Sequence, residues 1–158
     1  IKTIKRILEF TMSESNDFYK LFKPELTPKK MLEFGIFGGS YLGNTAKEFP
    51  NSWFIKAKIS KTFNVKLNYF QIRAGLSLKE WEKRGWIMKE DPRGWFQWYC
   101  RYTNGRRIPE IDKIQINRWR AFGPRHIGGI KKNCPKKNFS CRRKQRQALL
   151  QWAYSPFF

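Results

Sequence analysis

The sequence predicts a mainly helical, single small domain with an aromatic core. Helix-start signals recur along the chain, and most pair a polar capping residue with a proline or with a glutamate three positions later. Aromatic residues make up 17% of the chain, and several recur at helical spacing. Strand signals are weak, so at most one short β element is expected in the N-terminal half, from residues 53–59 or 64–72.

Two helix starts are expected in the first half of the chain. Thr27 followed by Pro28 has the pattern of an N-cap and a first helical residue. Ser77 and Glu80 form a capping box, in which the serine hydroxyl accepts from the amide of Glu80 and the glutamate reaches back. The helix that Ser77 starts should end at Gly85, because glycine readily ends helices.

An aromatic helix is expected to follow. Asp91 before Pro92 predicts its start, and Gly105 predicts its end. Four aromatic residues within it are spaced i, i+3, i+4 and i+7, so they form one stripe along the helix. We expect this stripe to build the core: Trp95, Trp98, Tyr99 and Tyr102.

Two further helices are expected in the last third of the chain. Pro109 starts the first, with Glu110 and Asp112 in its first turn, where negative charge complements the helix dipole. The last helix runs from about residue 140 to 153, with Leu149 on its inner face and Arg146 among the arginines of its outer face.

The chain has 158 residues, which suits one domain. Residues 1–23 are expected to form an N-terminal helix or arm, and residues 24–158 the domain. Ile1, Ile4, Ile7 and Leu8 share one helical face, with basic residues between them. Such a helix is either an ordinary terminal helix or the remnant of a targeting segment, and Glu9 favours the first because targeting segments are poor in acids.

The chain carries a formal net charge of +21, from 33 lysine and arginine residues against 12 acidic ones. Residues 1–100 contribute +8 and residues 101–158 contribute +13, and no acidic residue follows Asp112. Such a charge repels itself in a folded chain unless a polyanion neutralises it. DNA or RNA is therefore the expected partner. An anionic membrane surface is the rival, although no run approaches the roughly 20 apolar residues of a membrane span.

Basic residues in the last third are the expected phosphate contacts. Guanidinium groups match phosphate bidentately, and each contact releases condensed counterions. For the cluster on the last helix, from Arg142 to Arg146, a merely solvated charged face is disfavoured because no acid lies nearby to pair with it. The lysines around Pro135 are expected in a mobile stretch. The expected contacts are Arg106, Arg107, Arg118, Arg120, Arg125, Lys131, Lys132, Lys136, Lys137, Arg142, Arg143 and Arg146.

A glycine-rich loop at residues 35–43 (GIFGGSYLG) is a second candidate site. Glycine backbone can approach a phosphate or a base closely and offer amides to an anion. The loop lacks the Lys-Ser/Thr of a P-loop and does not match the dinucleotide fingerprint, so a tight structural turn is the other interpretation. Gly38, Gly39, Tyr41 and Asp91 are the candidate residues of a base or nucleotide pocket here.

The cysteines allow two arrangements. Cys100, His126, Cys134 and Cys141 could form a Cys3His zinc site, but the gap between Cys134 and Cys141 is longer than zinc knuckles use. Those two cysteines could instead pair with each other. We expect no metal and no cofactor. Three cysteines are too few for a secreted disulfide scaffold, so the protein is expected inside a cell or packaged in a virion, nucleoid or organelle.

The segment at 91–102 (DPRGWFQWYCRY), followed by Gly105-Arg106-Arg107, resembles a family of small basic proteins from bacteria, large DNA viruses, plants and fungi. Residues 118–119 (RW) and 146–154 (RQALLQWAY) share the resemblance, which covers roughly residues 24–154. No activity is established for that family. The resemblance therefore implies a self-contained domain and supplies no catalytic residue.

Three functions are consistent with these patterns. The leading expectation is a nucleic-acid-binding protein that packages or scaffolds DNA or RNA in a particle. The second is an enzyme that excises or modifies bases, which needs little more than a pocket, an acid and phosphate clamps. The third is a structural component of a viral or ribosomal assembly that binds acidic protein surfaces. No catalytic spacing is evident in the chain, so whether the protein is an enzyme stays open.

Overall fold

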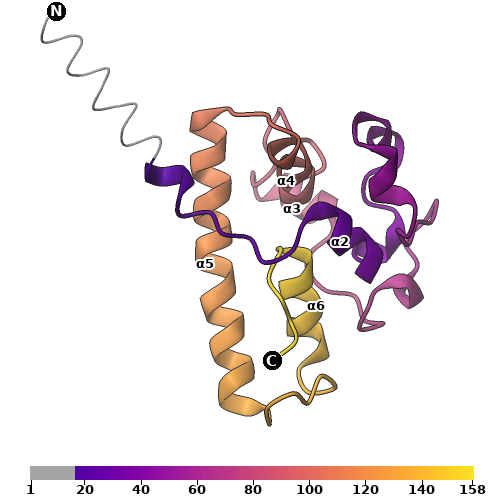
Figure 1. Ribbon diagram of the computed structural model, residues 1–158, viewed down its shortest axis with the longest axis vertical. Helices are drawn as coiled ribbons and strands as arrows, with labels where there is room; N and C mark the ends of the chain where they lie inside the picture. Colours follow the sequence, from indigo (N-terminus) through magenta and orange to yellow (C-terminus); the bar gives the residue numbers. More distant parts are fainter. Residues whose placement is uncertain (1–16) are drawn as a thin grey trace, which may run out of the picture.

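The structure of the protein is a computed structural model that describes residues 17–158. The amphipathic helix expected from Ile1 to Leu8 lies outside the described residues. The α-helices that Figure 1 labels are α2 (Pro28–Phe34), α3 (Leu78–Lys83), α4 (Trp95–Thr103), α5 (Pro109–Asn133) and α6 (Arg143–Gln151). Short 3-10 helices lie between α2 and α3: η1 (Phe37–Gly39), η2 (Gly43–Glu48), η3 (Asn51–Phe54) and η4 (Val65–Leu67).

The predicted helical domain is confirmed, and the short β element is not formed. Residues 17–158 contain no strand, only an isolated bridge between Met88 and Asp91. In the segment at 64–72, the side chain of Asn64 accepts from the amide of Lys66 at 3.1 Å and so caps η4. The backbone of Asn64 donates to the carbonyl of Gly38 at 3.0 Å, so the segment bonds to the glycine loop instead of to a neighbouring strand.

The helix starts expected in the first half are confirmed. The hydroxyl of Thr27 accepts from the amide of Lys30 at 3.2 Å, with Pro28 in the first turn of α2. The hydroxyl of Ser77 accepts from the amide of Glu80 at 3.3 Å at the start of α3. The carboxylate of Glu80 pairs with Lys83 at 3.7 Å, so the second bond of the predicted capping box does not form. The capping hydrogen bonds of both hydroxyls form because each hydroxyl and the amide that it accepts from lie within one helical turn of each other.

The cap expected at Asp91 is wrong. Helix α4 begins at Trp95, and Gly94 occupies its N-cap with a φ of 103°. Asp91 is instead fully buried and bound to Arg101 and Arg106. The aromatic helix therefore starts one turn later than predicted.

The aromatic stripe of α4 builds the core, as predicted. Trp95, Trp98 and Tyr99 are buried. The ring of Phe22, from the segment before α2, lies 5.4 Å from that of Trp98 and 5.0 Å from that of Trp119 on α5. Aromatic rings prefer such offset and edge-on arrangements, which add to the gain from burial.

Asp112 does more than complement the dipole of α5. Its carboxylate is buried and accepts from the indole of Trp98 at 2.8 Å and from the hydroxyl of Tyr19 at 2.6 Å. It also accepts from the amide of Ile108 at 2.9 Å, the residue before the helix. One carboxylate thus joins α4, α5 and the segment before α2.

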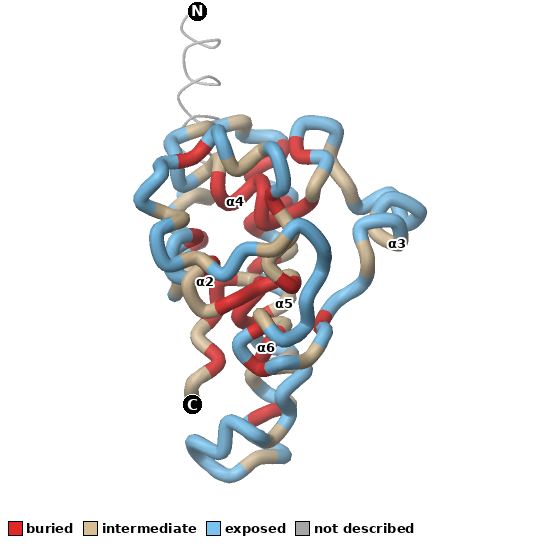
Figure 2. The backbone as a smooth tube through the Cα atoms, turned by 90° about the vertical axis from the view of Figure 1, so that its right-hand side faces the viewer, coloured by how far each residue is buried: buried red, intermediate tan, exposed pale blue. Residues whose placement is uncertain are grey.

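Helix α5 lies along one side of the molecule, with α6 beside it and α2 on the far side of α6 (Figure 1). The loop between α5 and α6 lies at one end of the domain. Figure 2 shows that the buried backbone runs through the middle, at α4, α5 and α6, whereas α3 and the α5–α6 loop are exposed.

Candidate nucleic-acid interface

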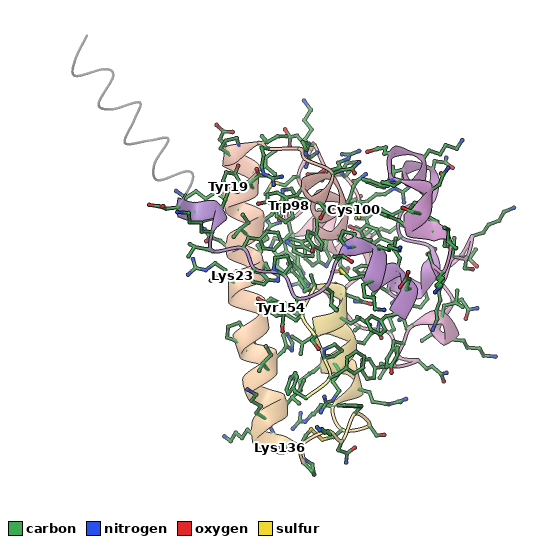
Figure 3. The ribbon with its side chains drawn as sticks, in the orientation of Figure 1. Tyr19, Lys23, Trp98, Cys100, Lys136 and Tyr154 are labelled. Atoms are coloured by element: carbon green, nitrogen blue, oxygen red, sulfur yellow. A yellow bond between two sulfur atoms is a disulfide. The ribbon has the colours of Figure 1, made fainter. Side chains whose placement is uncertain are left out.

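A group of exposed cations gathers where α5 ends, where α6 begins and in the loop between them. Figure 3 shows Lys136 at this end of the molecule, beside a disulfide. No acidic residue follows Asp112, and within residues 17–158 no member of the group forms an ion pair. We call this surface the basic end, and its residues are Lys131, Lys132, Lys136, Lys137, Arg142, Arg143 and Lys144.

The lysines expected in a mobile stretch are held by regular structure and by a disulfide. Lys131 and Lys132 lie in the last turn of α5, which continues to Asn133. Cys134 and Cys141 are disulfide-bonded, with their Cα atoms 5.8 Å apart, and they close the loop that carries Lys136 and Lys137. The basic end is therefore an ordered surface.

The four residues considered for zinc are not brought together. Cys134 and Cys141 bond to each other, and Cys100 is fully buried in the core, where burial raises the pKa of its thiol. His126 lies on α5 with its ring 4.3 Å from that of Phe122. In the part of the chain that the structure describes, no three potential metal ligands cluster.

Arg146 was predicted to contact phosphate, and the structure contradicts that prediction. It was expected to face solvent, but its exposed fraction is 0%. Its guanidinium donates to the carbonyls of Cys141 at 2.8 Å and Asn138 at 3.1 Å, in the disulfide loop. It also donates to Pro156 at 2.7 Å and Phe158 at 3.1 Å. Burial lowers the pKa of Arg146, yet all these partners favour its charged form, so the residue supports the basic end from within and does not face solvent.

Arg106 is also committed to an internal partner. It donates to Asp91 at 2.6 Å, and Arg101 donates to the other oxygen of the same carboxylate at 3.0 Å. Arg101 in turn binds Glu48 at 2.7 Å, and this guanidinium lowers the pKa of Glu48. A single buried carboxylate thus binds two arginines.

The other predicted arginines outside the basic end divide into two kinds. Arg107 stacks on the ring of Tyr102 at 3.5 Å and donates to the Tyr102 carbonyl. Arg118 donates to the carbonyl of Trp86 at 2.7 Å, and burial lowers its pKa. Arg120 and Arg125 are exposed on α5. Only the last two extend the cationic surface along that helix.

The glycine loop forms a structural turn. Gly38 has a φ of 60° and donates its amide to Asn68 at 2.7 Å. A Cβ at Gly38 would lie 2.5 Å from the ring of Phe63, and one at Gly39 would lie 2.9 Å from the carbonyl of Lys58. Segment 58–64 therefore occupies the space that a ligand would need beside these glycines.

The candidate pocket residues do not line one common cavity. Tyr41 lines a cavity beneath residues 74–87 that includes none of Gly38, Gly39 and Asp91. Its hydroxyl accepts from the amide of Gln97 at 3.3 Å, and burial raises the pKa of the phenol. Asp91 is bound to two arginines. The structure therefore does not assemble the predicted base pocket.

A different pocket, which the sequence analysis missed, lies between the segment at 74–86, α5 and α6. It has a volume of about 310 Å³. We call it the aromatic pocket, and its lining includes Trp81, Trp86, Phe122, His126, Lys144, Gln145, Ala148 and Trp152. Helical spacing could have shown that Phe122 and His126 share one face and that Lys144, Ala148 and Trp152 share another. Nothing in the spacing shows that these faces meet.

Comparison with known proteins identifies no relative. No family model, no curated protein and no solved structure matches the chain. No helix among residues 17–158 is both long and apolar enough to cross a membrane. The interface is therefore interpreted from its own geometry.

Proposed function

We propose that the protein binds the phosphate backbone of DNA or RNA through the basic end and packs or scaffolds that nucleic acid in a particle. The observation that carries this proposal is the gathering of exposed cations at the junction of α5 and α6, in a stretch that has no acidic residue after Asp112. Lysine and arginine at such density bind phosphates and release counterions. Phosphate contacts carry no sequence information directly, so the proposal covers both nucleic acids.

The basic end is structurally ordered, and this supports the proposal. The Cys134–Cys141 disulfide closes its loop, and Arg146 ties two carbonyls of that loop to residues 156–158. A surface that is already ordered loses less conformational entropy on binding. Disulfides persist in oxidising surroundings, which fits a packaged particle or an organelle better than a reducing cytosol.

The test is the dependence of affinity on salt. Fluorescence anisotropy with labelled single-stranded and duplex oligonucleotides, titrated over a range of salt concentrations, measures the slope of log affinity against log salt. We expect a steep negative slope, because each phosphate contact adds about 0.7 to 0.9 to its magnitude. A flat response would overturn the proposal.

Binding of the same cations to acidic protein surfaces is the competing explanation. It predicts partners that stay bound after nuclease treatment, whereas the present proposal predicts nucleic acid that co-purifies and is lost on that treatment. The arrangement that would favour base chemistry at Gly38, Tyr41 and Asp91 is not assembled in the described residues, which counts against an enzyme with that site.

A further inference from the structure

The aromatic pocket has walls of packed rings. Phe122 and Trp152 stack with their centroids 4.8 Å apart and their planes 18° from parallel. Trp81 and Trp86 meet edge to face at 5.3 Å, and the ring of Trp81 lies 5.9 Å from that of Trp152. The pocket volume of about 310 Å³ is at the lower end of the ~300–1,000 Å³ range of small-ligand sites. These walls suit a flat, aromatic ligand of modest size.

Two polar side chains, Gln145 and His126, also line the aromatic pocket. The amide nitrogen of Gln145 lies 3.5 Å from Nδ1 of His126. Its amide oxygen is buried and has no hydrogen-bond partner in the part of the chain that is described. An unsatisfied buried acceptor is costly, so this oxygen marks a place in the pocket wall that lacks a polar partner. Burial and the nearby Arg125 lower the pKa of His126, which favours the neutral imidazole. Because Nδ1 faces the amide donor of Gln145, the neutral ring carries its hydrogen on Nε2, which can donate to a ligand acceptor.

Cations lie at the pocket and connect it to the basic end. Lys144 belongs to both. Arg84 lies 5.0 Å above the ring of Trp86, and Arg118 holds the Trp86 carbonyl. Along α5, Lys131 follows His126 by five residues, or about 8 Å of helix. A ligand in this pocket would therefore have positive charge beside it.

We propose that the aromatic pocket binds one unstacked nucleobase of a single strand whose phosphates lie on the basic end. A nucleobase has the required features: two aromatic faces, N–H and C=O groups at its edge, and a phosphate chain attached. In a duplex its faces are stacked and its edge is paired, so only a single strand or a flipped base can enter. This inference rests on the proposed function and adds a preference for unpaired bases.

The test compares an intact single strand with an abasic strand of the same length and phosphate count, at one ionic strength. Ala148 is half-buried on the pocket wall, so Ala148→Phe fills the pocket. Ala121 is exposed on α5 outside the pocket, so Ala121→Phe is the matched control. We expect wild type to bind the intact strand about tenfold more tightly, since stacking one base on aromatic side chains strengthens binding. Ala148→Phe should reduce this ratio to within about twofold, and Ala121→Phe should keep it.

The outcomes separate this inference from the function on which it rests. Equal affinity of wild type for the two strands, with a steep salt dependence, overturns the pocket and leaves phosphate binding intact. No binding of either strand overturns phosphate binding. A titration with nucleoside monophosphate, followed by tryptophan fluorescence, then decides the pocket: quenching that Ala148→Phe abolishes supports it, and unchanged fluorescence overturns it.

A second variant covers failure of Ala148→Phe to fold. Trp86→Ala removes a wall ring that is 37% exposed and therefore contributes less to the core. It should also lower the ratio of the two affinities toward one. If a folded Trp86→Ala protein keeps the full preference for the intact strand, the pocket assignment is overturned.

Discussion

Arg146 donates from its guanidinium to the carbonyl of Pro156 at 2.7 Å, at a position with no exposure to solvent. The same group holds the carbonyl of Asn138 in the disulfide loop at 3.1 Å. One arginine thus joins the loop of the basic end to residues 156–158. Its charge stabilises the fold, while its neighbour Arg142 is exposed on the surface. Arg143 is also exposed, but its guanidinium donates to the carbonyl of Phe70 at 3.2 Å.

Replacing Arg146 should therefore affect stability and not phosphate binding. Arg146→Lys is expected to lower the free energy of unfolding by about 3 kcal/mol, because one ammonium cannot reproduce a planar fork that binds four carbonyls. Chemical denaturation measures the change. Arg142→Lys, at an exposed position, is the control and should change stability by less than about 0.5 kcal/mol. Equal effects of the two variants would contradict the assignment.

The exposed lysines of the loop should behave in the opposite way. Lys136→Gln with Lys137→Gln is expected to lower the magnitude of the salt slope by about 1 to 2, because up to two phosphate contacts are lost. The control is Lys29→Gln with Lys30→Gln, which removes the same charge from α2. Salt titrations of both proteins measure the slopes. If they fall equally, the binding surface is not the basic end.

The buried carboxylate of Asp91 should be essential for stability. Asp91→Asn is expected to lower the free energy of unfolding by about 3 kcal/mol, because Arg101 and Arg106 lose their shared charged partner. Urea denaturation at neutral pH measures it. Glu90→Gln alters the exposed neighbour, and it should leave the transition nearly unchanged. A stable Asp91→Asn protein would show that the arginines need no carboxylate.

The disulfide should order the basic end without changing its charge. Cys134→Ser with Cys141→Ser is expected to lower the free energy of unfolding by about 2 kcal/mol, because an open loop makes the unfolded chain freer. Affinity for nucleic acid should fall a few-fold at fixed salt with the slope unchanged, since the cations remain. Adding reductant to wild type should produce the same changes, and adding it to the double variant should produce none. A changed slope would contradict this prediction.

Stability should depend on pH through Glu48. Arg101 lowers the pKa of Glu48 below its ordinary value of 4.5, so the folded state favours the ionised carboxylate. The stabilisation is complete above the ordinary value and is lost as the pH falls through the lowered one. Glu48→Gln should therefore cost up to about 1 kcal/mol at pH 7, a small effect because the pair is exposed to solvent.

The difference between wild type and Glu48→Gln should disappear at acid pH. Denaturation curves for both proteins between neutral pH and pH 3 measure it. Glu82→Gln, an exposed residue of α3 outside these ion pairs, is the control. A difference that stays constant with pH would mean that the side chain acts through packing and not through its charge.

The success of helix prediction depended on distance along the chain. Thr27 and Ser77 cap their helices as expected because each bonds an amide three residues away. Asp91 has the same local pattern, yet its carboxylate binds arginines ten and fifteen residues further on. Because these two arginines bind the carboxylate of Asp91, it does not cap the helix, and α4 starts at Trp95. The last helix likewise starts at Arg143 instead of near 140, because the backbone of Arg142 is left-handed, with a φ of 57°.

The candidate site was less predictable than the helices. Exposure of Lys136 and Arg142 follows from their charge, whereas Arg146 looks the same in sequence and is fully buried. The aromatic pocket needs Trp86, Phe122 and Gln145 from three separate segments. No pattern within one segment reveals such a meeting.

Local sequence was enough to establish the helical class, the aromatic core of α4 and the surplus of positive charge in the last third. These depend on helix periodicity, capping and composition, which act between near neighbours. Tertiary packing alone decided which cations face solvent and where the aromatic pocket lies. It also decided that the ring of Phe63 occupies the space beside Gly38. The physical reason is that a buried arginine such as Arg146 is stable only beside carbonyls that the fold brings together from distant parts of the chain.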